Sequence, residues 1–121
     1  MATLSTHTLN GQDGSHAGGI RITLTCISGQ EMRIPVLSGE TDTGGRFNAS
    51  IEPANVDTSA IYELVLDTGS YWVPGPGNGS SNQTVNEVVM RFQMPDPDAR
   101  YHIPFILSPN SYSVWWSQPE V

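Results

Sequence analysis

The stretch Arg100–Ser113, RYHIPFILSPNSYS, predicts a strand, a tight turn and the start of a second strand. Its first half alternates with the period of two that is typical of an extended segment. The next four residues, Ser-Pro-Asn-Ser, suit a turn, because proline presets φ and the short polar side chains bond to nearby backbone. His102 lies within the first strand, on the face opposite to the main aliphatic set, and is therefore a candidate functional residue.

Similar alternation recurs along the rest of the chain, punctuated by turn-forming residues. Pro35 predicts an edge or bulged position in its strand, because proline cannot donate to a ladder. Asp67 and Thr68 predict the cap of a single helical turn that runs through Trp72. Many short strands with little helical periodicity indicate an all-β sandwich. The expected strands cover residues 4–9, 20–26, 32–36, 46–51, 61–66, 88–94, 101–107 and 112–116.

Length and charge narrow the classes of protein to consider. The 121 residues predict a single domain over 1–121. Twelve acidic residues against five arginines and no lysine give a formal charge of −7, which argues against nucleic acid or an anionic membrane as partner. No apolar run reaches the length of a transmembrane helix. The N-terminus lacks the charged and apolar regions of a signal peptide, so we expect a cytoplasmic protein.

Two residue types need a structural interpretation. Cys26, the only cysteine, shares the parity of Ile22 and Leu24, which predicts a buried thiol that acts as a small hydrophobe. His16 has no motif around it and is expected in a solvated turn. Two further histidines without a third ligand at short spacing do not predict a metal site, and no cofactor is expected.

The segment from His102 to Ser113, HIPFILSPNSYS, resembles the C-terminal signature of the transthyretin-like proteins, whose enzymatic branch is 5-hydroxyisourate hydrolase. Two further segments match in the right order. Ser5–Asn10, STHTLN, is similar to the branch's N-terminal histidine motif, and Leu66–Trp72, LDTGSYW, to its strand-to-helix corner. The resemblance covers nearly the whole chain. It implies a transthyretin-like β-sandwich of two four-stranded sheets with one short helix, assembled as a homotetramer around a channel.

The resemblance also implies where the site lies. In the family, the first and the last two strands share a sheet, and one face of it points into the channel between subunits. His7, Arg46 and His102 are then expected to be catalytic. Histidine suits acid–base work near neutral pH, and the planar guanidinium grips oxygens bidentately. The face is expected to bind a small-molecule substrate through Pro104, Ile106, Ser113, Trp115 and Ser117.

The C-terminal tail departs from the family. The hydrolase branch ends in Tyr-Arg-Gly-Ser, a tail that enters the site, whereas Trp115, Trp116, Ser117 and Gln118 stand here. Two indoles thus replace a phenol and a permanent cation, which favours a more apolar pocket. Parity predicts that Trp115 shares the histidine face and that Trp116 packs toward the core.

Three hypotheses follow. The first is a hydrolase-like enzyme that acts on a small cyclic substrate more aromatic than hydroxyisourate, by ring opening, isomerisation or cyclisation, as in a biosynthetic pathway. The second is 5-hydroxyisourate hydrolysis with a variant tail. The third is a non-catalytic carrier of an aromatic ligand. The retained His7, Arg46 and His102 favour an enzyme, and the altered tail disfavours hydroxyisourate as substrate.

Overall fold

The computed structural model describes residues 1–27, 32–52, 55–72 and 85–116. Every predicted strand is present, although its ends shift by a few residues. The last strand is shorter than predicted and ends at Val114 rather than Trp116. The strands are β1 (Ala2–Asn10), β2 (Arg21–Ile27), β3 (Arg33–Glu40), β4 (Arg46–Ile51), β5 (Ile61–Asp67), β6 (Glu87–Phe92), β7 (Arg100–Ser108) and β8 (Ser111–Val114).

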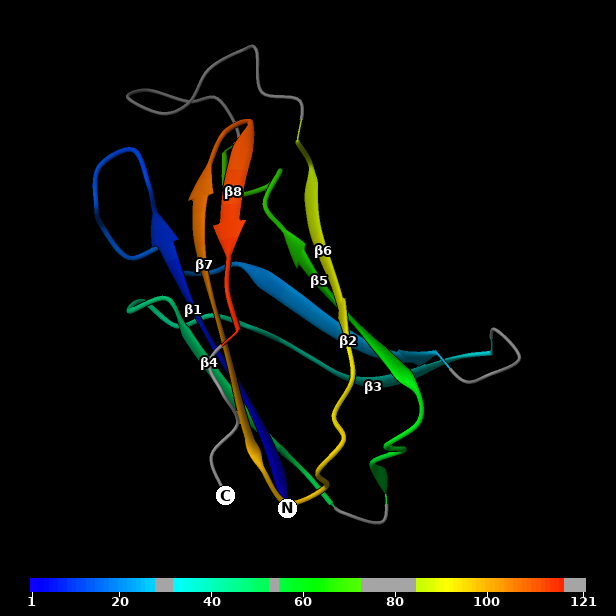
Figure 1. Ribbon diagram of the computed structural model, residues 1–121. Helices are drawn as coiled ribbons and strands as arrows, with labels where there is room; N and C mark the ends of the chain where they lie inside the picture. Colours follow the sequence, from blue (N-terminus) through cyan, green and yellow to red (C-terminus); the bar gives the residue numbers. More distant parts are fainter. Residues whose placement is uncertain (28–31, 53–54, 73–84, 117–121) are drawn as a thin grey trace.

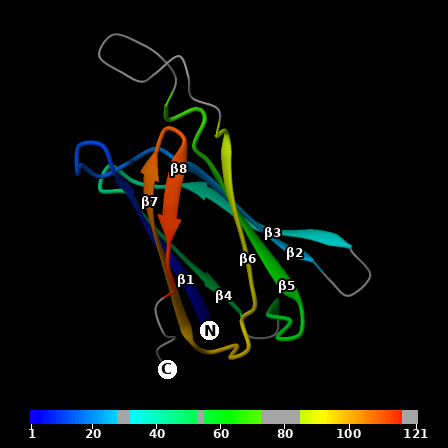
Figure 2. The same cartoon turned by 45° about the horizontal axis from the view of Figure 1, so that its top comes forward.

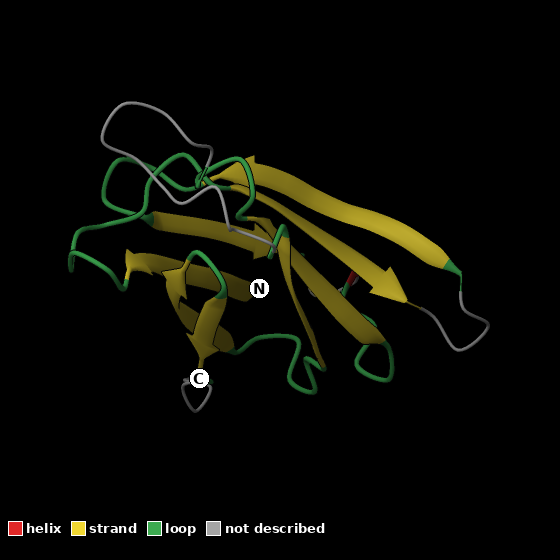
Figure 3. Ribbon diagram, turned by 90° about the horizontal axis from the view of Figure 1, so that it is seen from above, coloured by secondary structure: helices red, strands yellow, loops and turns green. Residues whose placement is uncertain are grey.

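The strands form two four-stranded sheets packed as layers (Figures 1 and 2). The first sheet has the order β4-β1-β7-β8, and the second has the order β3-β2-β5-β6. β1 and β7 run parallel, and the other neighbouring pairs are antiparallel. Figure 3 shows the two layers from above. The predicted all-β sandwich of two four-stranded sheets is therefore confirmed, and the first and the last two strands share one sheet.

The core lies between the two sheets and fixes which side chains point outward. Every second residue of β1 is buried, and β7 buries Tyr101, Ile103, Phe105 and Leu107. Burying a large apolar side chain stabilises the fold by about 1.5–3 kcal/mol, so a one-residue slip of either strand is strongly disfavoured. Residues of the opposite parity must then lie on the outer face of the first sheet.

The turn between β3 and β4 docks on β1 and sets the start of β4. Asp42 Oδ1 accepts hydrogen bonds from the backbone N–H groups of Gly44 and Arg46, each at 2.9 Å. Gly45 adopts a φ of 74°, and a Cβ there would collide with the backbone oxygen of Thr8. The Thr8 N–H in turn donates to the Gly45 carbonyl at 2.7 Å. Arg46 is thereby held beside β1.

The edge strand β3 behaves as its proline predicts. Leu24 pairs with Leu37 and Thr25 with Pro35, so Val36 is the extra residue of a β-bulge. The predicted edge or bulged position of Pro35 is confirmed on both counts. The expectation for Cys26 was too strong, because this thiol is only half-buried. β2 becomes half-exposed over its last three residues, where Cys26 lies.

The predicted short helix is a single hydrogen-bonded turn. Asp67 accepts hydrogen bonds from the Ser70 N–H and hydroxyl, as the predicted cap requires. The Trp72 N–H donates to the Thr68 carbonyl at 3.2 Å, which closes one turn. The described residues contain no α-helix, so the expectation of a helix is corrected to this turn. The proline expected to end it lies outside the described residues.

Candidate active site

The outer face of the first sheet carries most of the predicted site residues in neighbouring rows. In the central row, His7 of β1 is the register partner of Arg46 on β4 and of Pro104 on β7. The Trp115 N–H donates to the Pro104 carbonyl at 3.3 Å, which extends the row beyond β8. Cross-strand neighbours on one face have Cβ atoms about 5 Å apart. An arginine, a histidine, a buried proline and a tryptophan thus lie side by side across the sheet.

The next row places the second histidine. His102 of β7 is the register partner of Ser5 on β1, two positions before His7. The Ser5 hydroxyl lies 2.8 Å from Nδ1 of His102. This contact orients the ring and leaves Nε2 for a reacting group. The two predicted histidines therefore come together on adjacent strands.

On the other side of the central row, the face is more apolar. Ile106 of β7 pairs with Leu9 of β1 and with Ser113 of β8. Ile106 is 37% exposed and Ser113 is also exposed. These two predicted substrate-binding residues share the face of the histidines, whereas Ser117 lies outside the described residues.

The two tryptophans separate as their parity predicts. Trp116 contacts the core edge, with ring centroids 5.8 Å from Phe92 and 5.4 Å from Tyr101, although it is still 37% exposed. Trp115 remains 46% exposed. The chain leaves the ladder after Val114, where β8 ends, and Trp116 turns toward Phe92 on the second sheet.

The electrostatic surroundings of His7 favour its neutral form. Partial burial and then the Arg46 guanidinium lower the pKa of His7 below its ordinary value of 6.5, and His16 and His102 act in the same direction. A hydrogen bond to the backbone of Gly44 opposes them by raising this pKa. The net result is a histidine that is unprotonated at neutral pH, as a general base must be.

Arg46 is available to an external oxygen. Within the described ranges, no carboxylate lies at ion-pair distance from its guanidinium. The five N–H donors of a guanidinium suit a carbonyl oxygen or an oxyanion. The central row therefore places a neutral imidazole beside a guanidinium group.

His16 is the residue that the sequence interpretation missed. It is exposed, as expected, but its Nδ1 lies 2.9 Å from Nε2 of His7. The two rings are stacked, with centroids 5.0 Å apart and planes at 26°. Nothing in the sequence around His16 signals this contact, because it depends on how the loop after β1 folds back. The expectation of an uninvolved turn residue is therefore corrected.

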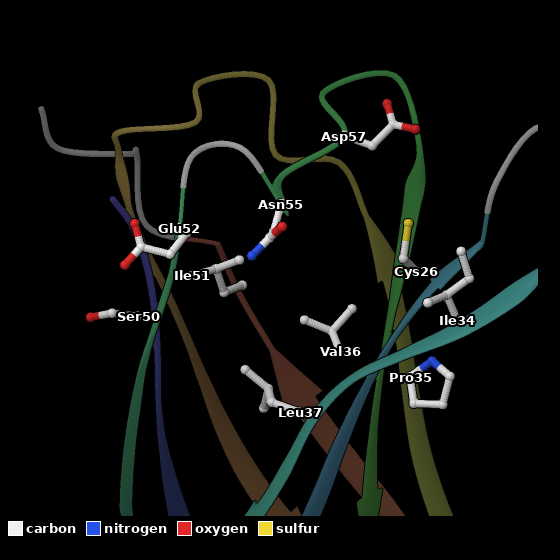
Figure 4. A pocket seen from close by; sticks show the side chains of 10 residues that line it. All are labelled: Cys26, Ile34, Pro35, Val36, Leu37, Ser50, Ile51, Glu52, Asn55 and Asp57. Atoms are coloured by element: carbon white, nitrogen blue, oxygen red, sulfur yellow. The ribbon is translucent and has the colours of Figure 1, made fainter.

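A cavity of about 560 Å³ opens elsewhere, between the edge strands β3 and β4 (Figure 4). Val36, Ile51 and Cys26 line it together with the polar rim residues Glu52 and Asp57. Its size fits a small ligand, but its lining contains neither histidine nor arginine. The acid–base groups lie instead on the open outer face of the first sheet.

Two classes of feature are absent from the described part of the chain. No helix there is long and apolar enough to cross a membrane. No three His, Cys, Asp or Glu side chains gather there in a group able to hold a metal ion.

Comparison with known proteins gives one consistent family. Residues 4–116 match the sequence profile described as HIUase/Transthyretin family. A 5-hydroxyisourate hydrolase of Pseudomonas aeruginosa is 29% identical over 95% of this chain and 90% of its own length. Another, from Ralstonia nicotianae, is 30% identical over 95% of this chain and 97% of its own length.

Solved structures agree on the fold. An (S)-allantoin synthase superposes with a TM-score of 0.82 at 27% identity, over 97% of this chain. This chain corresponds to only 44% of that protein's length. Transthyretin from Sparus aurata superposes with a TM-score of 0.73 at 22% identity, over 94% of this chain and 95% of its own. The second likeness supports the fold alone.

Proposed function

The chain belongs to the HIUase/Transthyretin family and is a hydrolase-family enzyme, and from that premise we propose that it opens a small cyclic carbonyl compound by acid–base catalysis. One observation carries the proposal. His7 lies in register with Arg46, which has no ion-pair partner among the described residues, and His102 lies two positions away on the adjacent strand. Two histidines and an arginine on one face can supply a base, an acid and an oxyanion holder.

The proposed reaction assigns one role to each group. Neutral His7 accepts a proton from water, and the resulting hydroxide adds to the ring carbonyl carbon. The carbonyl electrons move to oxygen, where the Arg46 N–H groups hold the negative charge. Collapse of this intermediate breaks the bond from carbon to the ring heteroatom, which takes a proton from Nε2 of His102. Proton exchange with water then restores both histidines.

The row beyond Pro104 supports a flat, largely apolar substrate. Trp115 offers an exposed indole on the histidine face, and Ile106 adds an exposed aliphatic surface. Indole stacking contributes on the order of 1 kcal/mol beyond area burial. Hydroxyisourate is small and densely polar, so it would gain little from these side chains.

We also propose that the site is completed by assembly into a homotetramer, with sites at subunit interfaces. The support is that the acid–base groups lie on an open sheet face rather than in a cavity. Water exclusion strengthens electrostatic catalysis, and an open face excludes water only when a second surface covers it. Light scattering that finds a monomer at micromolar concentration would contradict the shared site.

A direct test compares two ring-opening substrates. Hydroxyisourate is the polar probe, and 3,4-dihydrocoumarin is a flat, aryl-fused lactone; both reactions are followed by absorbance. We expect the unmodified enzyme to open the lactone faster than it hydrolyses hydroxyisourate, and His102→Ala to lose the lactone activity. The double variant Trp115→Tyr, Trp116→Arg should gain hydroxyisourate hydrolysis. Trp116→Arg alone, with a thermal melt, controls for the lost packing on Phe92.

Authentic 5-hydroxyisourate hydrolysis is the second candidate, because the relatives that match over most of this chain bear that name. Rapid hydroxyisourate decay by the unmodified protein would favour it over the proposed substrate class. If neither probe reacts with any variant, a carrier of an aromatic ligand becomes the better explanation.

A further inference from the structure

We propose that His16 and His7 form a proton-sharing dyad in which the outward base is Nε2 of His16. This inference rests on the proposed acid–base function and adds a residue to it. The proton that His7 gains from water then arrives through His16. His16 thus contacts the reacting water and passes its own Nδ1 proton to His7.

The geometry of His7 motivates the relay. Nε2 of His7 is 2.9 Å from Nδ1 of His16, so this ring nitrogen is already occupied. The remaining nitrogen, Nδ1, is the one that can bond to the backbone of Gly44. A proton on Nδ1 of His7 donates to the Gly44 carbonyl, which leaves Nε2 to accept the Nδ1 proton of His16. Nε2 of His16 is then the unprotonated, outward nitrogen of the pair.

The loop after β1 is built to hold His16 in this place. Leu9 and His16 form an antiparallel bridge, and the Asn10 N–H donates to the Ser15 carbonyl at 2.8 Å. Next to His16, the Ala17 N–H donates to the Thr8 carbonyl at 2.9 Å. The loop (blue in Figure 1) thus returns along β1 and is fastened on both sides of the histidine.

The side chains of Asn10 and Asp13 also form hydrogen bonds within the loop. Asn10 Oδ1 accepts hydrogen bonds from the backbone N–H groups of Gln12 and Asp13. Asp13 Oδ1 accepts from the Ser15 N–H at 2.9 Å and from its hydroxyl at 2.6 Å. These contacts restrict the loop backbone, so His16 needs little further ordering to meet His7.

The charges around the dyad suit a base that binds a proton only weakly. Arg46 on β4 and His102 on β7 both lower the pKa of His7. The carboxylates of Asp13 and Asp42 lie in the two neighbouring turns, where backbone N–H groups of the same turn hold them. The Gly44 backbone is the group that favours the protonated ring.

The relay moves two protons in coupled steps, and its net result is the transfer of one proton from water to the dyad. Nε2 of His16 takes a proton from water while the Nδ1 proton of His16 passes to Nε2 of His7. The charge then rests on His7, whose Nδ1–H remains on the Gly44 carbonyl. The hydroxide left behind attacks the substrate, and the return of the proton to water reverses both transfers.

Nitrogen-15 NMR of the histidine side chains tests the dyad without any substrate. We expect both His7 and His16 to carry their proton on Nδ1 at neutral pH, and the titration of His7 to depend on the presence of His16. His16→Asn keeps an amide donor near the position of Nδ1 but removes the second titrating ring. In that variant His7 should titrate alone and with a higher pKa, because the charge on His16 lowers it. An unchanged His7 titration, or a proton on Nε2 of His7, would overturn the dyad.

Kinetics separate a relay from simple orientation. His16→Asn should lose activity on the reactive ring-opening probe by roughly a hundredfold or more, because the outward base is gone. Ser15→Ala, which removes a loop hydrogen bond but keeps both rings, is the matched control and should stay near full activity. Full activity of His16→Asn, with His102→Ala inactive, would refute the relay and leave the proposed function standing. If the titration of His7 depends on His16 but the protein opens neither probe, the proposed function is refuted and the dyad stands.

Discussion

Arg33 and Arg91, on the outer face of the second sheet, have different surroundings from Arg46, on the outer face of the first sheet. On the second sheet, Glu63 lies between Arg33, at 2.8 Å, and Arg91, at 2.9 Å. The hydrogen bond from Arg33, followed by that from Arg91, lowers the pKa of Glu63 despite its burial. On the first sheet, Arg46 lies beside His7 without a carboxylate within ion-pair distance among the described residues.

This contrast separates charges that stabilise the sandwich from charges that serve chemistry. On the second sheet, one carboxylate contacts two arginines, so each of these guanidinium groups has an ion-pair partner within the chain. On the first sheet, the Arg46 guanidinium lies beside a neutral imidazole in a protein whose formal charge is −7. Such a guanidinium does not stabilise the fold by itself, and its complement is best sought in a substrate.

The largest expected effect of any variant is on the first sheet. His102→Ala should lower kcat by roughly 10²–10⁴-fold, because the proton donor to the leaving group is lost. Adding His7→Ala should cost little more, since the two histidines act as one unit. Steady-state kinetics with thermal melts measure both quantities. An active and fully folded His102→Ala variant would place the chemistry elsewhere.

A smaller effect, on stability alone, is expected from the second sheet. Glu63→Gln should lower the free energy of unfolding at pH 7 by about 1–2 kcal/mol, because two charge-assisted hydrogen bonds weaken and their arginines are largely exposed. Activity should not change. Urea denaturation of both proteins measures the difference.

The pH dependence of that difference follows from the lowered pKa of Glu63. A depressed folded-state pKa contributes stability above the unfolded value of 4.5, and this is lost as pH falls through the folded value. The gap between Glu63→Gln and the unmodified protein should therefore close below pH 4.5. A gap that persists at the lowest pH would show that packing, not charge, is responsible.

The smallest expected effects come from the two tryptophans, which should differ in whether they affect KM or stability. Trp115→Ala should raise KM for a flat apolar substrate about fivefold, which corresponds to about 1 kcal/mol of lost stacking, and should leave stability nearly unchanged. Trp116→Ala should instead lower the melting temperature, because its ring packs on Phe92 and Tyr101. The reverse pattern would mean that Trp116 faces the ligand.

The sequence was most informative for the strands, where the alternation of apolar and polar residues decides the structure. Alternation located the strands, and the bulge at Pro35 followed from its missing donor. Parity placed His102 opposite the aliphatic set of its strand, since a strand with a buried face has only two orientations. The resemblance to a family supplied what alternation cannot, namely that the first and the last two strands share a sheet and that the face with His7 and His102 carries the site.

Local patterns were insufficient for contacts that depend on the path of a loop, and for the end of a strand where a side chain can pack on either sheet. The contact between His16 and His7 requires the return path of the loop after β1, which no period encodes. The helical signal after β5 yields one turn, although its capping residue behaves as predicted. β8 ends at Val114, and Trp116 turns toward Phe92 on the other sheet, which alternation alone does not reveal.

The parallel pairing of β1 with β7 has a kinetic consequence. Ser5 and His102, which hydrogen-bond within the site, are separated by 97 positions in the chain. Contacts of such long range are slow to form, because the loop-closure entropy must be overcome before they stabilise anything. During synthesis, β4 can pair with one edge of β1 early, but the other edge of β1 stays unpaired until β7 leaves the ribosome. We expect catalytic competence to appear late in folding, and nascent chains that stop before residue 100 to be prone to aggregation.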